Sequence, residues 1–461
     1  MSAFRMLPRH SRGFTLIELM VAMVLGLLVA AGIVTVFAST SSSNKAQNQL
    51  AQLQEAGRFA VTRMGTDLRM ANGQYCTNTG GVAKIGTGGN ALDHIRAPKV
   101  YAKNLIGAAG AVSGAFGDVT TAWGAGSYPA APAAPYTMPS FLFMRGYECT
   151  LTAFTPVDPN TTISTIPAMG TAINNRVKGA DVLTVRYVNP AAGWAIVPAG
   201  VTGSTLATSS SAATITSITL VQRTGEPPVS NAANGDLFML ADCSNAQIFP
   251  ATASSVGVIT PLANTTDGFG TGAANLPTAQ EPESAPKVFD VNRDFQTVTY
   301  YLKLVSVNND GNAPFTGALI RRVNGGTAGR GGSEDELVRG VERLDFRYGV
   351  QDNTGKTSFL TAAQVDAAPA ASCPPAELNA ITATGCLWRS IKSIEVSLLM
   401  DGQTPLYTLT GNQLNYRYSA DANTGLLPPS GHAIRPSDQG FPDQLLRREF
   451  SVLVPVRNYN P

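Results

Sequence analysis

The amino-acid sequence predicts an α+β fold in which one long N-terminal helix is followed by a β-rich head with long loops. Three observations predict it. Residues 19–38 form an apolar run of twenty residues without a charge. The stretch that follows keeps a helical spacing of apolar side chains as far as Ala71. Beyond residue 73, short apolar or alternating runs are separated by segments rich in Gly, Pro and Ser, which is typical of strands and turns.

The composition excludes several classes of protein. Of the 461 residues, 44% are hydrophobic and only 14% are charged, which excludes a highly charged disordered chain, and 45 Gly with 29 Pro exclude a long coiled coil. The net charge is +2, with no basic run beyond the N-terminus, so no nucleic acid is expected as a partner. Only one segment could enter a bilayer, which excludes a multi-span transporter.

The first forty residues combine a basic leader with the apolar run. Arg5, Arg9 and Arg12 precede the run, and the next charge after it is Lys45. At about 1.5 Å per residue the run would span ~30 Å, the thickness of a bilayer core. The basic flank predicts a cytoplasmic start, with the bulk of the chain across the membrane. A cleaved secretory signal, a plain membrane anchor and a prepilin-type start all share these features.

Glu18 separates these alternatives. A carboxylate costs ~2.5–3.5 kcal/mol at mid-bilayer, and neither a signal nor an anchor requires one. The residues Gly13-Phe14-Thr15-Leu16-Ile17-Glu18, followed by the apolar run, closely resemble the prepilin signature of type IV pilins and type II secretion pseudopilins. A carboxylate buried among packed helices is tolerated when it meets a cation, and the free amine of a new N-terminal Phe14 could supply one.

The resemblance implies a processing site and a division of the chain. A prepilin peptidase would cut between Gly13 and Phe14, the new amine of Phe14 would be methylated, and Glu18 would set the register of the subunit during assembly. The expected regions are a leader peptide (1–13), a transmembrane or filament-core helix (14–38), the amphipathic half of that helix (39–72) and a globular β-rich pilin head with insertions (73–461).

The helix is predicted to continue past the membrane segment to Ala71. Apolar or small side chains recur there at intervals of three and four, at Ala46, Leu50, Leu53, Gly57, Val61, Met64 and Leu68. Asn72-Gly73 supplies a stop signal. Since no proline occurs between Phe14 and Ala71, we expect no proline-induced break.

The head is predicted to contain an antiparallel sheet packed on the second half of the helix. The clearest strand candidates are 181–188, 236–241, 298–307, 318–323, 344–350, 394–400 and 450–456. We expect 298–307 and 318–323 to form a hairpin around the turn at 308–312. The segments 104–140, 189–222 and 244–280 carry almost no charge and are interpreted as surface loops or weakly structured insertions.

The order of these segments resembles the W-type minor pilins of type IV pili, which are related to the J-type pseudopilin of type II secretion. Besides the N-terminal signature, the resemblance is carried by 181–187, 235–249 with Asp242-Cys243-Ser244, 337–349 and 447–458. It implies a non-enzymatic filament component that primes pilus assembly, in a tip complex with other minor pilins. A tip pseudopilin of type II secretion and a membrane-tethered periplasmic binding module stay open as alternatives.

The same resemblance implies partners and a location. The partners would be the prepilin peptidase, other minor pilins, the major pilin, the inner-membrane assembly platform, a large tip adhesin and, before assembly, membrane lipid. The chain would cross the inner membrane of a Gram-negative bacterium once, with a periplasmic head, and would later reach the pilus and the cell surface.

All five cysteines follow the apolar run, in what would be an oxidising compartment. Cys373 and Cys386 close a short loop and are predicted to pair. Two of Cys76, Cys149 and Cys243 could form a second bridge, with one thiol left over. The sequence has no Cys-x-x-Cys motif and no Cys/His cluster, so no metal is expected.

No motif predicts catalysis or a cofactor. The histidines at 94 and 432 are isolated and are expected on the surface or in loops. Residues 349–357 place five residues between two glycines, where a phosphate loop has four, and are interpreted as a turn after a strand. The Asp-rich turns at 290–294, 308–312 and 437–443 could hold calcium, but none has the repeated acidic spacing of a calcium loop, so they are interpreted as solvated. Residues 333–336 are interpreted as an exposed charged turn, with a docking point for a neighbouring subunit as the alternative.

Overall fold

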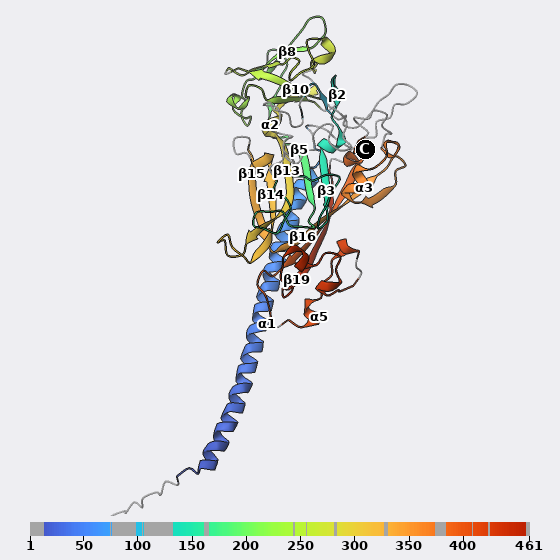
Figure 1. The fold of residues 1–461 in the computed structure, drawn as a ribbon. Helices are drawn as coiled ribbons and strands as arrows, with labels where there is room; N and C mark the ends of the chain where they lie inside the picture. The colour runs from blue at the N-terminus through green and yellow to red at the C-terminus, as the bar shows by residue number, and fades with distance from the viewer. Residues whose placement is uncertain are drawn as a thin grey trace, which may run out of the picture.

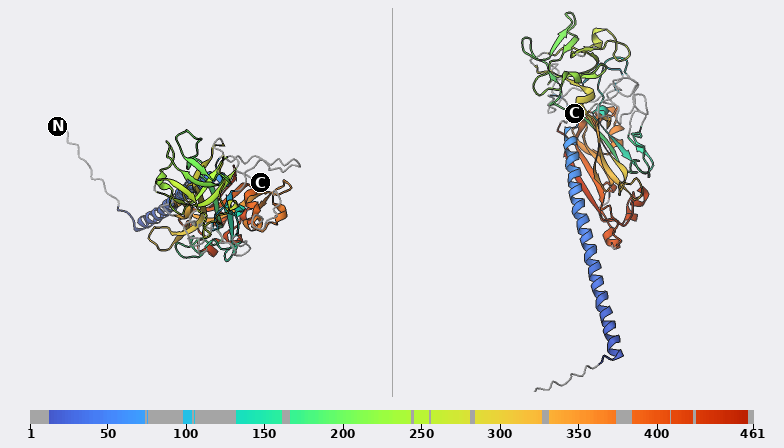
Figure 2. Two further views of the ribbon diagram at one scale, coloured as in Figure 1. Left: turned by 90° about the horizontal axis from the view of Figure 1, so that it is seen from above. Right: turned by 90° about the vertical axis from the view of Figure 1, so that its left-hand side faces the viewer.

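A computed structural model describes residues 13–73, 75, 98–103, 105, 132–160, 166–242, 245–254, 256–280, 284–326, 331–373, 384–407, 409–422 and 425–457. One long helix leads into a head of three mainly antiparallel sheets, which confirms the predicted α+β fold (Figure 1). The helix projects far beyond the head at its N-terminal end and lies along the head over its C-terminal end (Figure 2). The leader up to residue 12, Cys76, His94 and Cys243 lie outside the described residues.

Helix α1 runs without interruption from Leu16 to Met70. The Thr15 side chain accepts a hydrogen bond from the Glu18 amide (3.2 Å), and the Glu18 carboxylate accepts one from the Thr15 amide (2.9 Å), which together form a capping box. At the other end Asn72 adopts a left-handed conformation (φ 62°), which terminates the helix at the predicted stop. The helix is unbroken, as the absence of proline predicts.

Two sheets form the part of the head that packs on α1. The six-stranded sheet has the order β15 (Ser333–Arg339), β14 (Phe315–Val323), β13 (Phe295–Ser306), β5 (Val182–Val188), β3 (Met144–Cys149) and β4 (Phe154–Thr155). The four-stranded sheet has the order β17 (Thr357–Leu360), β16 (Val341–Gln351), β18 (Ile391–Asp401) and β19 (Arg447–Pro455). The predicted β13–β14 hairpin is confirmed, and apolar side chains of both sheets share one core with α1.

A nine-stranded sheet lies at the far end of the head from the projecting helix (Figure 1). Its main order is β6 (Trp194–Ala195), β12 (Lys287–Asp290), β9 (Leu237–Ala241), β10 (Ala246–Ala253), β11 (Val258–Pro261), β8 (Ile215–Thr219) and β7 (Thr205–Thr208). The short strands β1 (Lys99–Val100) and β2 (Tyr136–Thr137) pair beside β10. One face of this distal sheet has a hydrophobic core of its own, whereas the other face, with Met239 and Ile248, belongs to the main core.

The distal sheet corrects the interpretation of 189–222 and 244–280 as loops. These segments contain strands β6, β7, β8, β10 and β11. Ile218, Phe249 and Ile259 are fully buried in the core of this sheet. Thr between the apolar residues suits a strand, because its β-branched side chain packs well on a pleated surface. A low charge content therefore marks strands here and not surface loops.

The charged segment at 333–336 is also corrected, because it belongs to strand β15 and not to a turn. β15 is an edge strand, and its Glu334 meets cations on β13 and β14. Glu334 accepts hydrogen bonds from Lys303 (2.6 Å) and Arg322 (3.0 Å). Charges on an edge strand are compatible with the ladder and discourage pairing with another chain.

Candidate functional site

The predicted processing site lies at the very start of the described residues. Gly13, Phe14 and Thr15 precede the first helical residue, and the Phe14 side chain is 89% exposed. The Gly13–Phe14 peptide bond is therefore in non-helical backbone next to an exposed side chain. Glu18 lies in the first turn of the helix, where its carboxylate meets the Thr15 amide and hydroxyl (2.9 Å each). Phe14 and Glu18 thus occupy the same end of α1.

The first half of α1 exposes apolar side chains all round. Every Leu, Ile, Val, Met and Phe from Leu16 to Phe37 is more than half exposed, the least exposed being Val21 at 54%. This is the one helix among the described residues that is long and apolar enough to cross a membrane, with a mean hydropathy of 2.7 over its most apolar window. Such a surface is far larger than the apolar patches that soluble monomers expose, so it requires a bilayer or other protein around it.

The second half of α1 buries one face against the head. Leu53, Ala60, Met64 and Leu68 are almost fully buried in the core shared with the two sheets. Gly57 permits the closest approach, because a Cβ there would lie 2.5 Å from the ring of Phe450 on β19. The predicted stripe is therefore the contact face of the helix, and its small residue lets β19 pack against the backbone.

A buried ion pair fixes this half of the helix to the six-stranded sheet. Asp67 is 3% exposed, and its carboxylate accepts hydrogen bonds from Arg321 Nε (2.6 Å) and Nη2 (3.2 Å) on β14. The hydroxyls of Tyr300 on β13 (2.6 Å) and Tyr187 on β5 (3.1 Å) donate to the same carboxylate. One helix side chain thereby contacts three adjacent strands.

The electrostatics of Asp67 favour its ionised form. Burial by itself would raise the pKa of this carboxyl, but the hydrogen bonds from Arg321 and Tyr300 outweigh burial and hold the pKa below its usual value. Burial and the neighbouring Asp67 charge raise the pKa of Tyr300, so its hydroxyl stays a donor. No local pattern signals this contact, since 254 positions separate Asp67 from Arg321.

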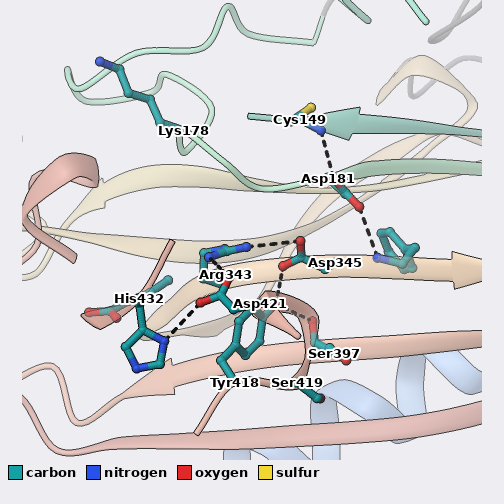
Figure 3. Close-up of polar contacts among 12 residues, drawn as sticks. Cys149, Lys178, Asp181, Arg343, Asp345, Ser397, Tyr418, Ser419, Asp421 and His432 are labelled. Atoms are coloured by element: carbon teal, nitrogen blue, oxygen red, sulfur yellow. Dashed lines mark hydrogen bonds and ion pairs between the residues drawn. The ribbon is translucent and has the colours of Figure 1, made fainter. Parts of the chain in front are cut away.

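A second polar cluster lies where the segment after β18 covers the four-stranded sheet (Figure 3). Arg343 on β16 forms ion pairs with Asp421 (3.1 Å) and Asp345 (3.2 Å). The Tyr418 hydroxyl donates to Asp345, and His432 Nδ1 lies 3.0 Å from the Asp421 carboxylate. Burial by itself would lower the pKa of Arg343, but Asp345 and the other acidic neighbours outweigh burial and raise the pKa above its usual value, so Arg343 stays a cation.

His432 lies in a loop, as one form of the expectation has it, but it is not on the surface. It is only 5% exposed and stacks on Tyr416 with ring centroids 3.8 Å apart. Its Nε2 lies 3.2 Å from the Tyr416 carbonyl oxygen, and its Nδ1 faces Asp421. The histidine therefore holds the covering segment together, and its distance in sequence from Asp421 and Tyr416 leaves no local pattern to reveal this.

Asp181 joins the two sheets beside this cluster (Figure 3). Its carboxylate accepts hydrogen bonds from the Cys149 amide on β3 (2.9 Å) and the Phe346 amide on β16 (3.1 Å). Burial and the nearby Asp345 raise the pKa of Asp181 well above its usual value. Burial and Asp181 likewise raise the pKa of the Cys149 thiol, so this cysteine has no reactive thiolate at neutral pH.

Cys373 and Cys386 form a disulfide with their Cα atoms 5.8 Å apart. The bond ties the segment after α3 (Ala362–Asp366) to the turn η9 (Cys386–Ser390), both of which pack in the main core. Cys149 is a free buried cysteine. Within the described ranges, no three His, Cys, Asp or Glu side chains are grouped so as to hold a metal ion.

Two family models match the chain. The model of the type IV pilus-assembly protein W matches residues 299–458, a region that runs from β13 through the end of β19. The prokaryotic N-terminal methylation motif matches residues 8–34, which include Gly13, Phe14 and Glu18. No curated protein and no solved structure matches the chain. All strands of the distal sheet lie outside both matched regions.

Proposed function

We propose that this chain, a minor pilin of the W type by its two family matches, primes the assembly of a type IV pilus and stays in a complex at the filament tip. Its role in this proposal is structural and not catalytic. Before assembly it is anchored by the first half of α1 in the inner membrane of a Gram-negative bacterium, with the head in the periplasm. Other minor pilins and the major pilin replace the lipid around the helix when the subunit leaves the bilayer.

The main support for the proposal is the exposed first half of α1. No described part of the head covers the apolar side chains from Leu16 to Phe37. A helix that is apolar all round is stable in a bilayer or in a bundle of similar helices. A pilin helix would lie in the bilayer before assembly and in the helix bundle of the filament afterwards.

Processing supplies the second step of the proposal. Cleavage after Gly13 by a prepilin peptidase would place a free amine on Phe14, about one helical turn before Glu18. In a filament, the Glu18 carboxylate would meet the Phe14 amine of a neighbouring subunit, because burial of that carboxylate is costly without a cation. The Thr15 capping box would hold the carboxylate at the helix start until then.

The position at the tip rests on the bulk of the head. A distal sheet with its own core lies beyond the sheets that pack on α1 (Figure 1). Heads of this size would hinder regular stacking along a thin shaft, whereas a tip has room for them. A tip pseudopilin of type II secretion is the second candidate, since the same N-terminal signature serves both systems.

Deletion and complementation would test the function. We expect a deletion strain to lose surface pili and twitching while type II secretion continues, and the wild-type chain to restore pili. The Glu18→Ala variant should be processed and inserted into the membrane but should fail to restore pili. Glu55→Ala, an exposed change on the same helix, is the matched control and should restore them. Loss of secretion with normal piliation would favour the pseudopilin instead.

A further inference from the structure

A groove lies between α1 and the loop that follows β18. It has a volume of about 650 Å³ and is lined on the helix side by residues from Phe37 to Gln52 and on the head side by Thr404, Pro405, Leu406 and Tyr407. The loop is held in place, because Gln49 Nε2 donates to the Thr404 carbonyl oxygen (3.0 Å) and the Leu406 amide donates to the Gln444 carbonyl oxygen (2.8 Å). Tyr407 is nevertheless 83% exposed.

The groove begins where the apolar run ends. Phe37 and Ala38, the last residues of the run, line it together with Ser41 and Lys45. At about 1.5 Å per residue, Lys45 lies ~10 Å above Ala38 along the helix. A bilayer has ~5–8 Å of headgroup region beyond each side of its hydrocarbon core. When the apolar run spans the core, the lower end of the groove, at Phe37, Ala38 and Ser41, therefore lies in the headgroup layer. The Lys45 backbone lies ~2–5 Å beyond that layer, within reach of its long side chain.

The charge of the groove fits that layer. Lys45 is the one charged residue among those that line it. The sequence from residue 402 to residue 416 contains no charge, and no acidic residue occurs between Glu18 and Glu55. Phosphate groups would therefore meet one cation and no carboxylate. An exposed tyrosine beside an apolar helix end is also typical of membrane interfaces, where the ring lies among headgroups and the hydroxyl faces water.

We propose that this groove seats phospholipid headgroups of the leaflet on the side of the head, with a lipid phosphate at Lys45 and the Tyr407 ring in the interface. The head is then docked on the membrane and is not only tethered above it. Docking fixes the depth and tilt of α1 in the waiting subunit. Extraction into a filament must break this contact. The inference rests on the proposed anchoring of the first half of α1 in a bilayer.

The test uses the full chain reconstituted into phosphatidylcholine vesicles containing phosphatidylglycerol and a lipid with a nitroxide on its headgroup. The Tyr407→Trp variant adds a fluorophore at the groove. The Val256→Trp variant adds one at another strongly exposed position (75%), next to β11 of the distal sheet. We expect the added emission of Tyr407→Trp to fall about twofold or more when the nitroxide lipid is present, because interfacial aromatic side chains lie at headgroup depth. The emission of Val256→Trp should not change.

Further measurements separate the possible outcomes. Quenching of the Tyr407→Trp chain is compared between vesicles that contain phosphatidylglycerol and vesicles of pure phosphatidylcholine. If quenching is stronger with phosphatidylglycerol, adding Lys45→Gln to the chain should remove that difference. In the wild-type chain, amide hydrogen exchange over 402–416 should be slower in vesicles than in detergent. Equal quenching of both tryptophan variants, or exchange unchanged by lipid, would overturn the docking. A chain that does not float with vesicles would instead overturn the membrane anchoring on which the inference rests.

Discussion

The two halves of α1 form one continuous helix with opposite surroundings. In the first half no large apolar side chain is less than 54% exposed, whereas in the second half Leu53, Ala60, Met64 and Leu68 are at most 3% exposed. The first half is apolar all round, and the second has an apolar stripe with a buried Asp67. The apolar side chains of the first half therefore need other molecules to cover them, whereas those of the second half are covered by the chain's own head.

This contrast shows where the chain fixes its own structure and where it leaves contacts to be made. Packing at Gly57 and the ion pair at Asp67 determine how the helix lies on the head. In the first half, a Cβ added at Gly26 or Gly32 would meet no atom within 4 Å, so both positions are open to contacts with other molecules. Changes on the buried face of the second half should therefore alter the stability of the head, and the same changes in the first half should not.

Asp67→Ala should cause the largest loss of stability. The change leaves Arg321 without its main partner, and breaking a buried ion pair from one side costs about 3–5 kcal/mol. Urea unfolding of the full chain in detergent, followed by a signal from the head, would measure the loss. Glu55→Ala, on the exposed face of the same half, should change the free energy of unfolding by less than about 0.5 kcal/mol. Equal effects of the two changes would contradict the role of the ion pair.

The Asp67 contact should also make the head sensitive to acid. Because the pKa of Asp67 is lower in the folded chain than its usual value, the stabilisation is complete above pH ~4 and is lost as the pH falls through the folded pKa. An Asp67→Asn variant has no such charge to lose. The stability difference between wild type and Asp67→Asn should therefore shrink as the pH falls below ~4. A difference that is constant from pH ~3 to pH ~7 would contradict this.

Gly57→Ala and Gly32→Ala compare the same change in the two halves. At Gly57 the new methyl group would overlap the Phe450 ring, and overpacking of this kind costs about 1–3 kcal/mol, partly offset by the ~1 kcal/mol gain in helix propensity. We expect a net loss of about 1 kcal/mol in urea unfolding. At Gly32 nothing lies within 4 Å, so the head should unfold as in wild type. A stabilised Gly57→Ala chain would show that Phe450 moves aside freely.

Tyr187→Phe should have a smaller effect than the other changes around Asp67. It removes one hydrogen bond to the carboxylate, of 3.1 Å, while Arg321 and Tyr300 still satisfy that group. The expected loss is about 0.5–1 kcal/mol in urea unfolding. Tyr75→Phe is the control for the loss of a hydroxyl itself. The Tyr75 hydroxyl donates to the Ala285 carbonyl oxygen (3.2 Å) and does not contact Asp67. In a double change with Asp67→Ala, the effect of Tyr187→Phe should disappear.

The parts of the molecule that can be predicted from the sequence are those whose signal is local. The length of α1, its stop at Asn72, its buried stripe and the β13–β14 hairpin follow from periodicities and turn residues within short windows. Thr15 and Glu18, two residues of the stretch that resembles a prepilin signature, also form the capping box at the start of α1. Resemblance, and not periodicity, supplies the predicted cleavage position and the role of Glu18.

The remaining features depend on residues that are distant in sequence. The Asp67–Arg321 pair and the burial of His432 against Tyr416 arise only when separate strands and loops come together. In the distal sheet only β9 is predicted, as the strand candidate 236–241, and its other strands escape prediction for another reason. Several of its strands are short and contain Ser or Thr with little charge, a composition that also indicates loops, although the buried Ile218, Phe249 and Ile259 lie among those residues.

The mass of the mature N-terminus would show whether the exposed first half of α1 is a processed pilin helix. Mass spectrometry of the membrane or pilus fraction should detect a chain that begins at a methylated Phe14. A chain that begins at Ser39 would have lost the whole apolar half, and a chain that keeps Met1 would be an unprocessed anchor. Either result would contradict the proposed processing and, with it, the role of Glu18 in the filament.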